Sequence, residues 1–358
     1  MSGKIHFHLL FIIIPLVMIC SCSGKPERSR KPVIAVEMAP AMKSYIYGQA
    51  ISLHIQTKMK NGTLKRVGVF LNEQLITSET KEDFFCKINS LNVLGNNTIR
   101  VLAEKTDGVS NTRTIPFTVL SDTAPVGYDY SLIRDYPHSN DNFTQGLLFH
   151  EGFLYEGTGE NGKSFVYKIN LSKNTVIQKV ALPEKYFGEG ITILHDKIYQ
   201  LTYKHQTCFV YQLSNFALID SFKFVSAEGW GLTTDGKSLI MSDGTGVLTW
   251  INPADYSVEK RIQVADQEKV LQYINELEYD HGTIWANIWT TDQIIRIDAS
   301  SGKVTGVLDM RGLLSVMNSS NQRIDVLNGI AVFPGSGHLL ITGKLWPKMF
   351  EIKVNTSK

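Results

Sequence analysis

Ten residues of this 358-residue chain recur at equivalent points of a repeated pattern, and together they offer acid–base chemistry. Five stand inside the opening motif of each repeat: Gln145, Glu189, Trp230, Asn275 and Asn328. Five more follow the second apolar segment of each repeat: Gly159, Tyr203, Gly244, Trp289 and Lys344. A carboxylate can accept and return a proton, amide and ammonium groups can stabilise an oxyanion, and aromatic rings can hold apolar groups. Glu189 and Lys344 are the ionisable pair of this set, so they are the first candidates for catalysis.

Each of these residues also has a purely structural interpretation. Glu189 could cap backbone amides, and Lys344 could be a solvated lysine at the rim. The aromatic residues could pack between neighbouring sheets, and for Asn328 the holding of a loop is the preferred interpretation. Asp243, in the sequence SDGT, is expected to form a turn. The functional hypothesis therefore depends on the joint location of the ten residues.

The elements that must position these residues are short strands in a fivefold repeat. The opening motifs are TQGL (144–147), GEGI (188–191), GWGL (229–232), INEL (274–277) and LNGI (327–330). They recur at roughly 40 to 50 residues, the size of a four-stranded propeller blade. Each begins an apolar strand, and a second strand follows after a tight turn, as in 153–157, 197–201 and 283–287. Because the second strand runs back antiparallel to the first, its end returns to the same face, and both sets of residues surround one mouth.

The fifth repeat stops after residues 349–354 and lacks a fourth strand. A closed ring leaves no free sheet edge, so another segment must complete this sheet. Residues 130–136 lie before the first repeat and have strand character. We expect them to close the ring by pairing with the C-terminal strand.

The N-terminal region has a different pattern. Residues 33–120 show short alternating strands with turn signals at Asn61-Gly62 and Asp107-Gly108, typical of an Ig-like sandwich without a catalytic constellation. Residues 121–127 are expected to be a linker, and residues 128–358 the catalytic propeller. The predicted fold class is thus all-β, a five-bladed β-propeller preceded by a small Ig-like β-sandwich.

The first 22 residues resemble a bacterial lipoprotein signal peptide. A positive start at Lys4 precedes an apolar run over 9–19 and the motif ICSC, in which Cys22 follows the small residue Ser21. We expect Cys22 to carry the lipid and residues 23–32 to be a tether; a plain secretion signal is the alternative. The expected location is a membrane-anchored exported protein, periplasmic or at the cell surface. The outer membrane is preferred because Ser23 gives no obvious retention signal.

Composition and spacing exclude several other classes. The formal charge is +2 and no long basic run is present, which argues against nucleic acid as a partner. No His or Cys spacing typical of a metal site is present, and no dinucleotide or phosphate-loop motif stands in a fitting context, so no metal and no cofactor are expected. Cys86 and Cys208, which fall in different predicted domains, are expected to be buried free thiols.

Several stretches resemble the plant and bacterial type of glutaminyl-peptide cyclotransferase. They are NFTQGL (142–147), YFGEG (186–190), EGWGL (228–232), SDGT (242–245), INELE (274–278), WANIW (285–289), LNGI (327–330) and TGKLWP (342–347). The resemblance implies an enzyme that converts the N-terminal glutamine of peptides or proteins to pyroglutamate and releases ammonia without a metal.

The resemblance also implies residue roles. Glu189 would be the general acid/base, with Lys344 as a second catalytic group. Substrate would bind between Gln145, Phe187, Tyr203, Trp230, Asn275 and Trp289. Tyr203 departs from the family pattern, where a tryptophan is expected.

Two other functions stay open at this point. One is a non-catalytic propeller that binds a peptide or small ligand at the same mouth. The other is a sugar-acting enzyme that pairs Glu189 with Glu276, although the strand register directs Glu276 away from Glu189.

Overall fold

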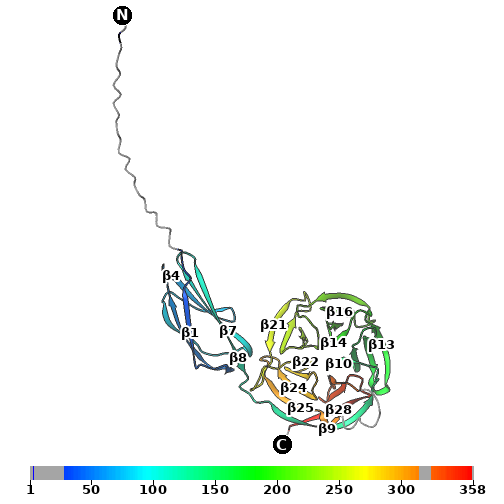
Figure 1. The fold of residues 1–358 in the computed structure, drawn as a ribbon. Coiled ribbons are helices and arrows are strands. Elements are labelled where there is room, and N and C mark those ends of the chain that lie inside the picture. Colours follow the sequence, from blue (N-terminus) through cyan, green and yellow to red (C-terminus); the bar gives the residue numbers. More distant parts are fainter. Residues whose placement is uncertain (1–2, 4–27, 314–323, 357–358) are drawn as a thin grey trace.

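The computed structural model describes residues 3, 28–313 and 324–356, and these are almost entirely β-structure. Figure 1 shows a ring of sheets formed by the C-terminal part of the chain and a smaller β-structure beside it, formed by the N-terminal part. Helical structure in the described ranges is confined to the 3-10 turn η1 (Leu171–Lys173) and to residues 311–313. Cys22 and most of the predicted signal segment lie outside the described residues.

Three four-stranded antiparallel sheets follow one another along the ring, each with its strands in chain order. The first contains β10 (Thr144–His150), β11 (Phe153–Thr158), β12 (Phe165–Asn170) and β13 (Thr175–Ala181); the second β14 (Gly188–Leu194), β15 (Lys197–Thr202), β16 (Thr207–Gln212) and β17 (Leu218–Lys223); the third β18 (Leu232–Thr234), β19 (Leu239–Ser242), β20 (Val247–Ile251) and β21 (Val258–Gln263).

The rest of the ring is a continuous eight-stranded sheet in the order β22-β23-β24-β25-β9-β28-β27-β26. Its members are β22 (Ile274–Asp280), β23 (Thr283–Ile288), β24 (Gln293–Asp298), β25 (Val304–Asp309), β26 (Leu327–Val332), β27 (Leu339–Gly343), β28 (Lys348–Thr356) and β9 (Val126–Pro137). β9 pairs antiparallel with β28 along almost its whole length, from Tyr128 opposite Thr356 to Pro137 opposite Lys348. The predicted ring closure is therefore confirmed. The closing strand is longer than predicted, and its first residues also pair parallel with β25.

The first strand of each group lines the inside of the ring. β10, β14, β18, β22 and β26 contact one another in this order, and β26 contacts β10 again. Apolar clusters fill the spaces between adjacent sheets; one of them packs Tyr199 and Leu201 of β15 against Leu232 of β18 and Met241 of β19. Burial of such side chains is the main force that holds the sheets together.

The inner strands are interrupted at the end that forms the mouth. The pairing of β10, β14, β22 and β26 with their second strands shifts register across Gln145, Glu189, Asn275 and Asn328, respectively. A β-bulge re-aims the side chain at the interruption. Gly231, next to Trp230, lets the neighbouring strand come close, because an added Cβ there would lie 2.0 Å from the Asn275 carbonyl oxygen.

The N-terminal part contains two sheets. One is three-stranded, in the order β1-β3-β6, with β1 (Val33–Ala39), β3 (Ile51–Lys58) and β6 (Asp83–Ile88). The other is five-stranded, in the order β2-β8-β7-β4-β5, with β2 (Ser44–Ile46), β8 (Ser110–Leu120), β7 (Gly95–Lys105), β4 (Leu64–Leu71) and β5 (Gln74–Glu79). Alternate residues of β3 and β7 point into a shared apolar core, as expected for sheets with one buried face.

The two cysteines of the described chain, Cys86 and Cys208, are both buried and free, as predicted. No helix within the described ranges is long and apolar enough to cross a membrane.

Candidate active site

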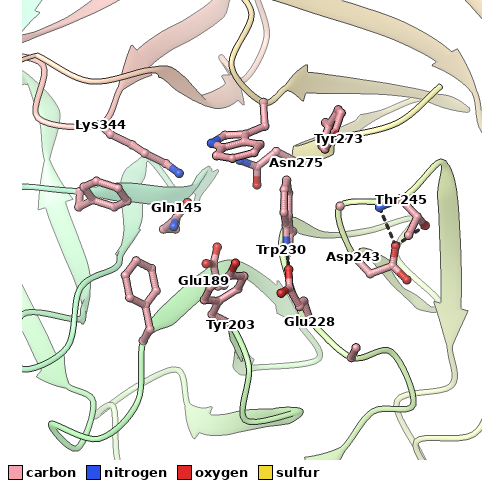
Figure 2. A pocket seen from close by; sticks show the side chains of 15 residues that line it. Gln145, Glu189, Tyr203, Glu228, Trp230, Asp243, Thr245, Tyr273, Asn275 and Lys344 are labelled. Carbon is pink, nitrogen blue, oxygen red and sulfur yellow. Dashed lines mark hydrogen bonds between the residues drawn. The ribbon is translucent and has the colours of Figure 1, made fainter.

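A cavity of about 630 Å³ opens at the mouth of the ring where the strand interruptions lie. Figure 2 shows its lining from close by. The lining residues are Phe143, Gln145, Phe187, Glu189, Tyr203, Ala227, Glu228, Trp230, Asp243, Gly244, Thr245, Tyr273, Asn275, Trp289 and Lys344. The eight residues predicted to act in catalysis or substrate binding are all among them. Gly159 and Asn328, two members of the repeat set, are not.

Glu189 lies on the inner strand β14 and is 5% exposed. Burial raises the pKa of its carboxyl well above the ordinary value; Lys344 acts against this rise, and the negative charge of Glu228 adds to it. Within the described part of the chain its carboxylate has no hydrogen-bond or ion-pair partner. A buried carboxyl of raised pKa that is free to bind a ligand is suited to accept and return a proton.

Lys344 directly follows β27 and is also 5% exposed. Its backbone is fixed by two hydrogen bonds, from its own N–H to the Val326 carbonyl and from the Asp325 N–H to its carbonyl, each 2.9 Å. Burial lowers the pKa of its ammonium, while Glu189 and Asp325 act in the opposite direction. The ammonium nitrogen lies 4.7 Å from the centre of the Phe143 ring. It projects into the cavity on the same side as Gln145 (Figure 2).

Two amide side chains complete the polar part of the cavity. Gln145 is 2% exposed, and its Oε1 accepts a 3.1 Å hydrogen bond from Nδ2 of Asn328. Asn328 also donates to the Thr144 carbonyl at 2.9 Å, so its role is to hold Gln145 and its strand, the structural interpretation preferred from the sequence. Asn275 is 3% exposed, and its buried Oδ1 has no hydrogen-bond partner in the described structure. Such an atom is suited to accept a hydrogen bond from a bound ligand.

One aromatic wall consists of Trp230 and Trp289. The indole N–H of Trp230 donates to Glu228 at 3.0 Å, and its ring packs against Gly244, where an added Cβ would come within 2.6 Å of it. The two indoles meet edge to face with centroids 5.6 Å apart. The position of Trp230 is therefore fixed on three sides.

The opposite wall consists of phenylalanine and tyrosine rings. Phe187 lies edge to face with Phe143 at 5.9 Å and also 5.9 Å from Tyr203. Gly159 makes room for Phe187, because an added Cβ would lie 2.4 Å from that ring. Gly159 thus contributes to the site because its lack of a side chain leaves the space that the Phe187 ring occupies.

Glu276 is buried and directly follows the cavity residue Asn275 in sequence, but its carboxylate binds backbone groups inside the ring. Its oxygens accept hydrogen bonds from the backbone N–H groups of Leu147 on β10 (3.2 Å) and Ile330 on β26 (2.9 Å). It does not line the cavity. The two-carboxylate arrangement of a sugar-acting enzyme is therefore not supported.

The sequence reasoning did not single out Phe143, Glu228, Thr245 and Tyr273 as lining residues, and assigned Asp243 to a turn. The turn is present, since Asp243 accepts from the Thr245 N–H at 3.1 Å, but it also lines the cavity. Phe143 and Glu228 lie within stretches that carried the family resemblance, and that proximity was a usable signal. Tyr273 had no such signal.

Groups of three or more His, Cys, Asp or Glu side chains arranged to hold a metal ion are absent from the described ranges. The three carboxylates of the cavity do not form such a group, because Glu228 accepts from Trp230 and Asp243 accepts from Thr245.

An all-β ring with a buried carboxyl, two amides and aromatic walls at one mouth defines an enzyme-like pocket for a small polar group. A family model described as glutamine cyclotransferase matches residues 102–354. The chain therefore belongs to the glutamine cyclotransferase family, as the sequence resemblance implied, and this is a family of enzymes.

Two relatives are similar over about two thirds of the chain. Glutaminyl-peptide cyclotransferase of Arabidopsis thaliana is 39% identical over 231 residues, which cover 63% of this chain and 71% of the plant protein. The crystal structure of Myxococcus xanthus glutaminyl cyclase is 34% identical and matches with a TM-score of 0.61, over 65% of this chain and 100% of that protein.

Proposed function

We propose that this enzyme is a glutaminyl-peptide cyclotransferase, which converts the N-terminal glutamine of peptides or proteins to pyroglutamate with release of ammonia. The observation that carries the proposal is Glu189, a buried carboxyl without an internal partner among the described residues, placed between amide donors and aromatic walls. Family membership supports the same reaction. A non-catalytic propeller would have no use for an unpaired buried carboxyl, so that alternative is not favoured.

The proposed reaction begins with the neutral α-amine of the substrate, which attacks the δ-carbon of its own side-chain amide. Both reacting groups belong to one residue, so the enzyme acts largely by folding and orienting that residue. The bond from the α-nitrogen to the δ-carbon forms, and Glu189 accepts the proton that the α-nitrogen loses. When the bond from the δ-carbon to the amide nitrogen breaks, Glu189 returns this proton to the departing nitrogen and ammonia leaves.

The surrounding groups would stabilise the charge that develops. The amide nitrogen of Gln145 and the ammonium of Lys344 can donate hydrogen bonds to the oxyanion on the δ-carbon. The oxygen of the same Gln145 amide already accepts a hydrogen bond from Asn328, which orients the nitrogen. The unpaired Oδ1 of Asn275 can accept from an N–H of the substrate. Trp230, Trp289, Phe187 and Tyr203 would enclose the methylene groups, and a cavity that opens at one mouth suits a chain end.

The proposed fold assignment is the finer one made from the sequence. The contacts of the five inner strands support a five-bladed β-propeller whose last blade is completed by β9. The two sheets over residues 33–120 around one core support an Ig-like sandwich. The proposed divisions are 23–32 tether, 33–120 sandwich, 121–127 linker and 128–358 propeller; β9 begins at Val126, inside the last part of the linker.

The test of function is ammonia release from a peptide with N-terminal glutamine, with the product mass measured in parallel. The expected result is one ammonia per peptide and the loss of one ammonia in mass. The same peptide with an acetylated N-terminus is the matched control, because its α-nitrogen is no longer a nucleophile. Absence of ammonia from the free peptide would refute the proposal.

The lipid anchor is a separate proposal, supported by the ICSC motif that ends at Cys22. It predicts that Cys22→Ala moves the exported protein from the membrane fraction to the soluble fraction. Unchanged membrane partition of this variant would contradict it.

A further inference from the structure

The cavity extends beyond the inner groups that act in the proposed reaction, and Trp289 stands where this inner part meets an outer part. Tyr273 and Trp289 line this outer part and are 54% and 38% exposed. Their rings lie 6.0 Å apart, and Trp289 in turn contacts Trp230 at 5.6 Å. In Figure 2, Trp230 stands between Glu189 and Tyr273. The aromatic row Trp230–Trp289–Tyr273 therefore runs from the acid–base group outward.

Tyr273 is held in a conformation that tyrosine rarely adopts. Its φ is +62°, in the left-handed region that favours glycine. Two hydrogen bonds hold it there: its N–H donates to the Gly244 carbonyl at 2.8 Å, and its carbonyl accepts from the Trp289 N–H at 2.9 Å. A strained residue that persists at the edge of a cavity points to a functional use of its position.

Tyr273 directly follows a short hairpin, residues 264–271 with the connecting residue 272, and we call residues 264–272 the brace. Leu271 donates to the Val264 carbonyl at 2.9 Å, and Ala265 is bridged to Val270. The brace is also hydrogen-bonded to the loop that lines the cavity, since the Val264 N–H donates to the Gly246 carbonyl at 2.8 Å. Tyr273 follows the brace directly, and Asn275 comes two residues later, so a shift of the brace reaches the cavity directly.

The other side of the brace is embedded in the N-terminal part of the chain. Ala265 is fully buried in the apolar core of the N-terminal sheets, and Val270 packs against that core. Asp266 accepts from the Ser121 N–H at 2.9 Å. An apolar side chain shared with the core of another unit makes a fixed connection, because its exposure would cost free energy.

Polar contacts beside the brace fix its orientation, at Gln263, which precedes it, and at Lys303, which is bridged to Ala265. The Gln263 side-chain amide makes two hydrogen bonds to the backbone of Asn96, 2.8 Å from its N–H and 3.0 Å to its carbonyl. Lys303 pairs with Asp122 at 2.7 Å and lies 4.0 Å from the centre of the Tyr47 ring. Gly95 permits the first contact, since an added Cβ there would lie 2.3 Å from Gln263.

We propose that Tyr273, with Trp289, forms a subsite for the peptide residue that follows the N-terminal glutamine, and that the N-terminal sheets hold this subsite in place through the brace. The proposal rests on the proposed function, because it assumes that a glutamine residue occupies the inner cavity. The peptide residue that follows this glutamine must then lie against the exposed end of the aromatic row, at Trp289 and Tyr273. Tyr273 is a binding residue here, and Gln263 and Lys303 are positioning residues.

The test compares two substrates of the full-length enzyme: glutamine amide, which has no second residue, and a tripeptide of glutamine, phenylalanine and alanine. For Tyr273→Ala we expect kcat/KM on the tripeptide to fall about tenfold, the scale of a lost aromatic contact. On glutamine amide we expect a change of no more than about twofold, within the effect of distant substitutions. Tyr273→Phe keeps the ring and should restore the tripeptide value.

The brace is tested by the double variant Gln263→Ala/Lys303→Ala, with Lys65→Ala as the matched control. Lys65 pairs with Glu104 on the N-terminal sheets, away from the interface, at 2.7 Å. We expect the double variant to lower the ratio of tripeptide to glutamine-amide kcat/KM by about threefold, a partial loss of preorganisation. The control should leave this ratio unchanged.

Each outcome decides a different point. Equal losses on both substrates, or no loss, for Tyr273→Ala would overturn the subsite. A lower melting temperature with an unchanged substrate ratio in the double variant would overturn the role of the brace. If the wild type is active and every variant keeps the wild-type ratio of tripeptide to glutamine-amide kcat/KM, only this inference is refuted. If the wild type is inactive on both substrates, the proposed function is refuted and the inference with it.

Discussion

Replacement of Glu189 by glutamine separates a catalytic carboxyl from a structural one. Gln keeps the shape of the side chain but cannot carry a proton between two nitrogen atoms. The expected loss in kcat is about a hundredfold or more, the usual scale of general acid–base catalysis, which corresponds to roughly 2.7 kcal/mol of barrier.

The structure also predicts the effect of Glu189→Gln on folding. Glu189 makes no hydrogen bond or ion pair with the described residues, so the substitution breaks no such contact. The folded-state pKa of Glu189 is raised above its unfolded value, so any stability from this group is present below the unfolded pKa and is lost as pH rises through the folded pKa. At pH 8 the variant should therefore melt at the same temperature as the wild type or above it.

The assay is ammonia release under saturating peptide, beside a melting curve of the same preparation. Glu189→Asp is a useful companion, because it retains a carboxyl but withdraws it by one methylene group, and should recover part of the lost rate. A structural Glu189 gives the opposite pattern, with a lower melting temperature and wild-type turnover in the folded fraction. That pattern would refute the mechanism proposed above.

Three further predictions concern two buried carboxyl groups of the ring and the absence of a metal from the proposed reaction. The charge of Lys344 lowers the pKa of Glu189, whereas the charge of Glu228 raises it. The acidic limb of the kcat/KM profile against pH should therefore move to higher pH in Lys344→Met and to lower pH in Glu228→Gln. Shifts of both variants in the same direction would contradict this. Burial raises the pKa of Glu278 to about 8, so the free energy of unfolding should fall between about pH 5 and pH 8, where the unfolded chain has lost this proton and the folded protein still holds it. Glu278→Gln should flatten that dependence in urea titrations. EDTA or phenanthroline should leave activity intact, and a loss that added metal restores would show that a metal takes part.

The repeat register predicted much of the mouth because it depends on local chain properties. Strand alternation and the opening motifs are visible in the sequence, and side chains at equivalent register positions must reach the same end of the ring. Closure by the strand before the first repeat followed from the cost of an unpaired sheet edge. The register could not show that Asn328 turns to hold Gln145, because that contact depends on the packing of two neighbouring inner strands.

Tyr273 and the brace lay beyond such reasoning for a physical reason. The brace is a hairpin held by one bridge and a few hydrogen bonds, too short for a periodic pattern. Its contacts with Asn96 and Ser121 join segments more than a hundred residues apart, and they exist because of the relative placement of the two parts of the chain. The family resemblance covered the ring and so gave no information about these contacts.

The buried carboxylates of the ring show why Glu189 stands apart. Glu156 is fully buried and receives hydrogen bonds from Asn142 and Thr144, at 2.8 and 2.7 Å, and pairs with His138 at 2.9 Å. Glu276 receives two backbone N–H groups from other inner strands. Folding satisfies a buried carboxylate in this way when its role is structural, since an unpaired one costs free energy. Glu189 has no such partner in the described chain and faces the open cavity together with Lys344, where the α-amine of an N-terminal glutamine is the partner that the proposed reaction supplies.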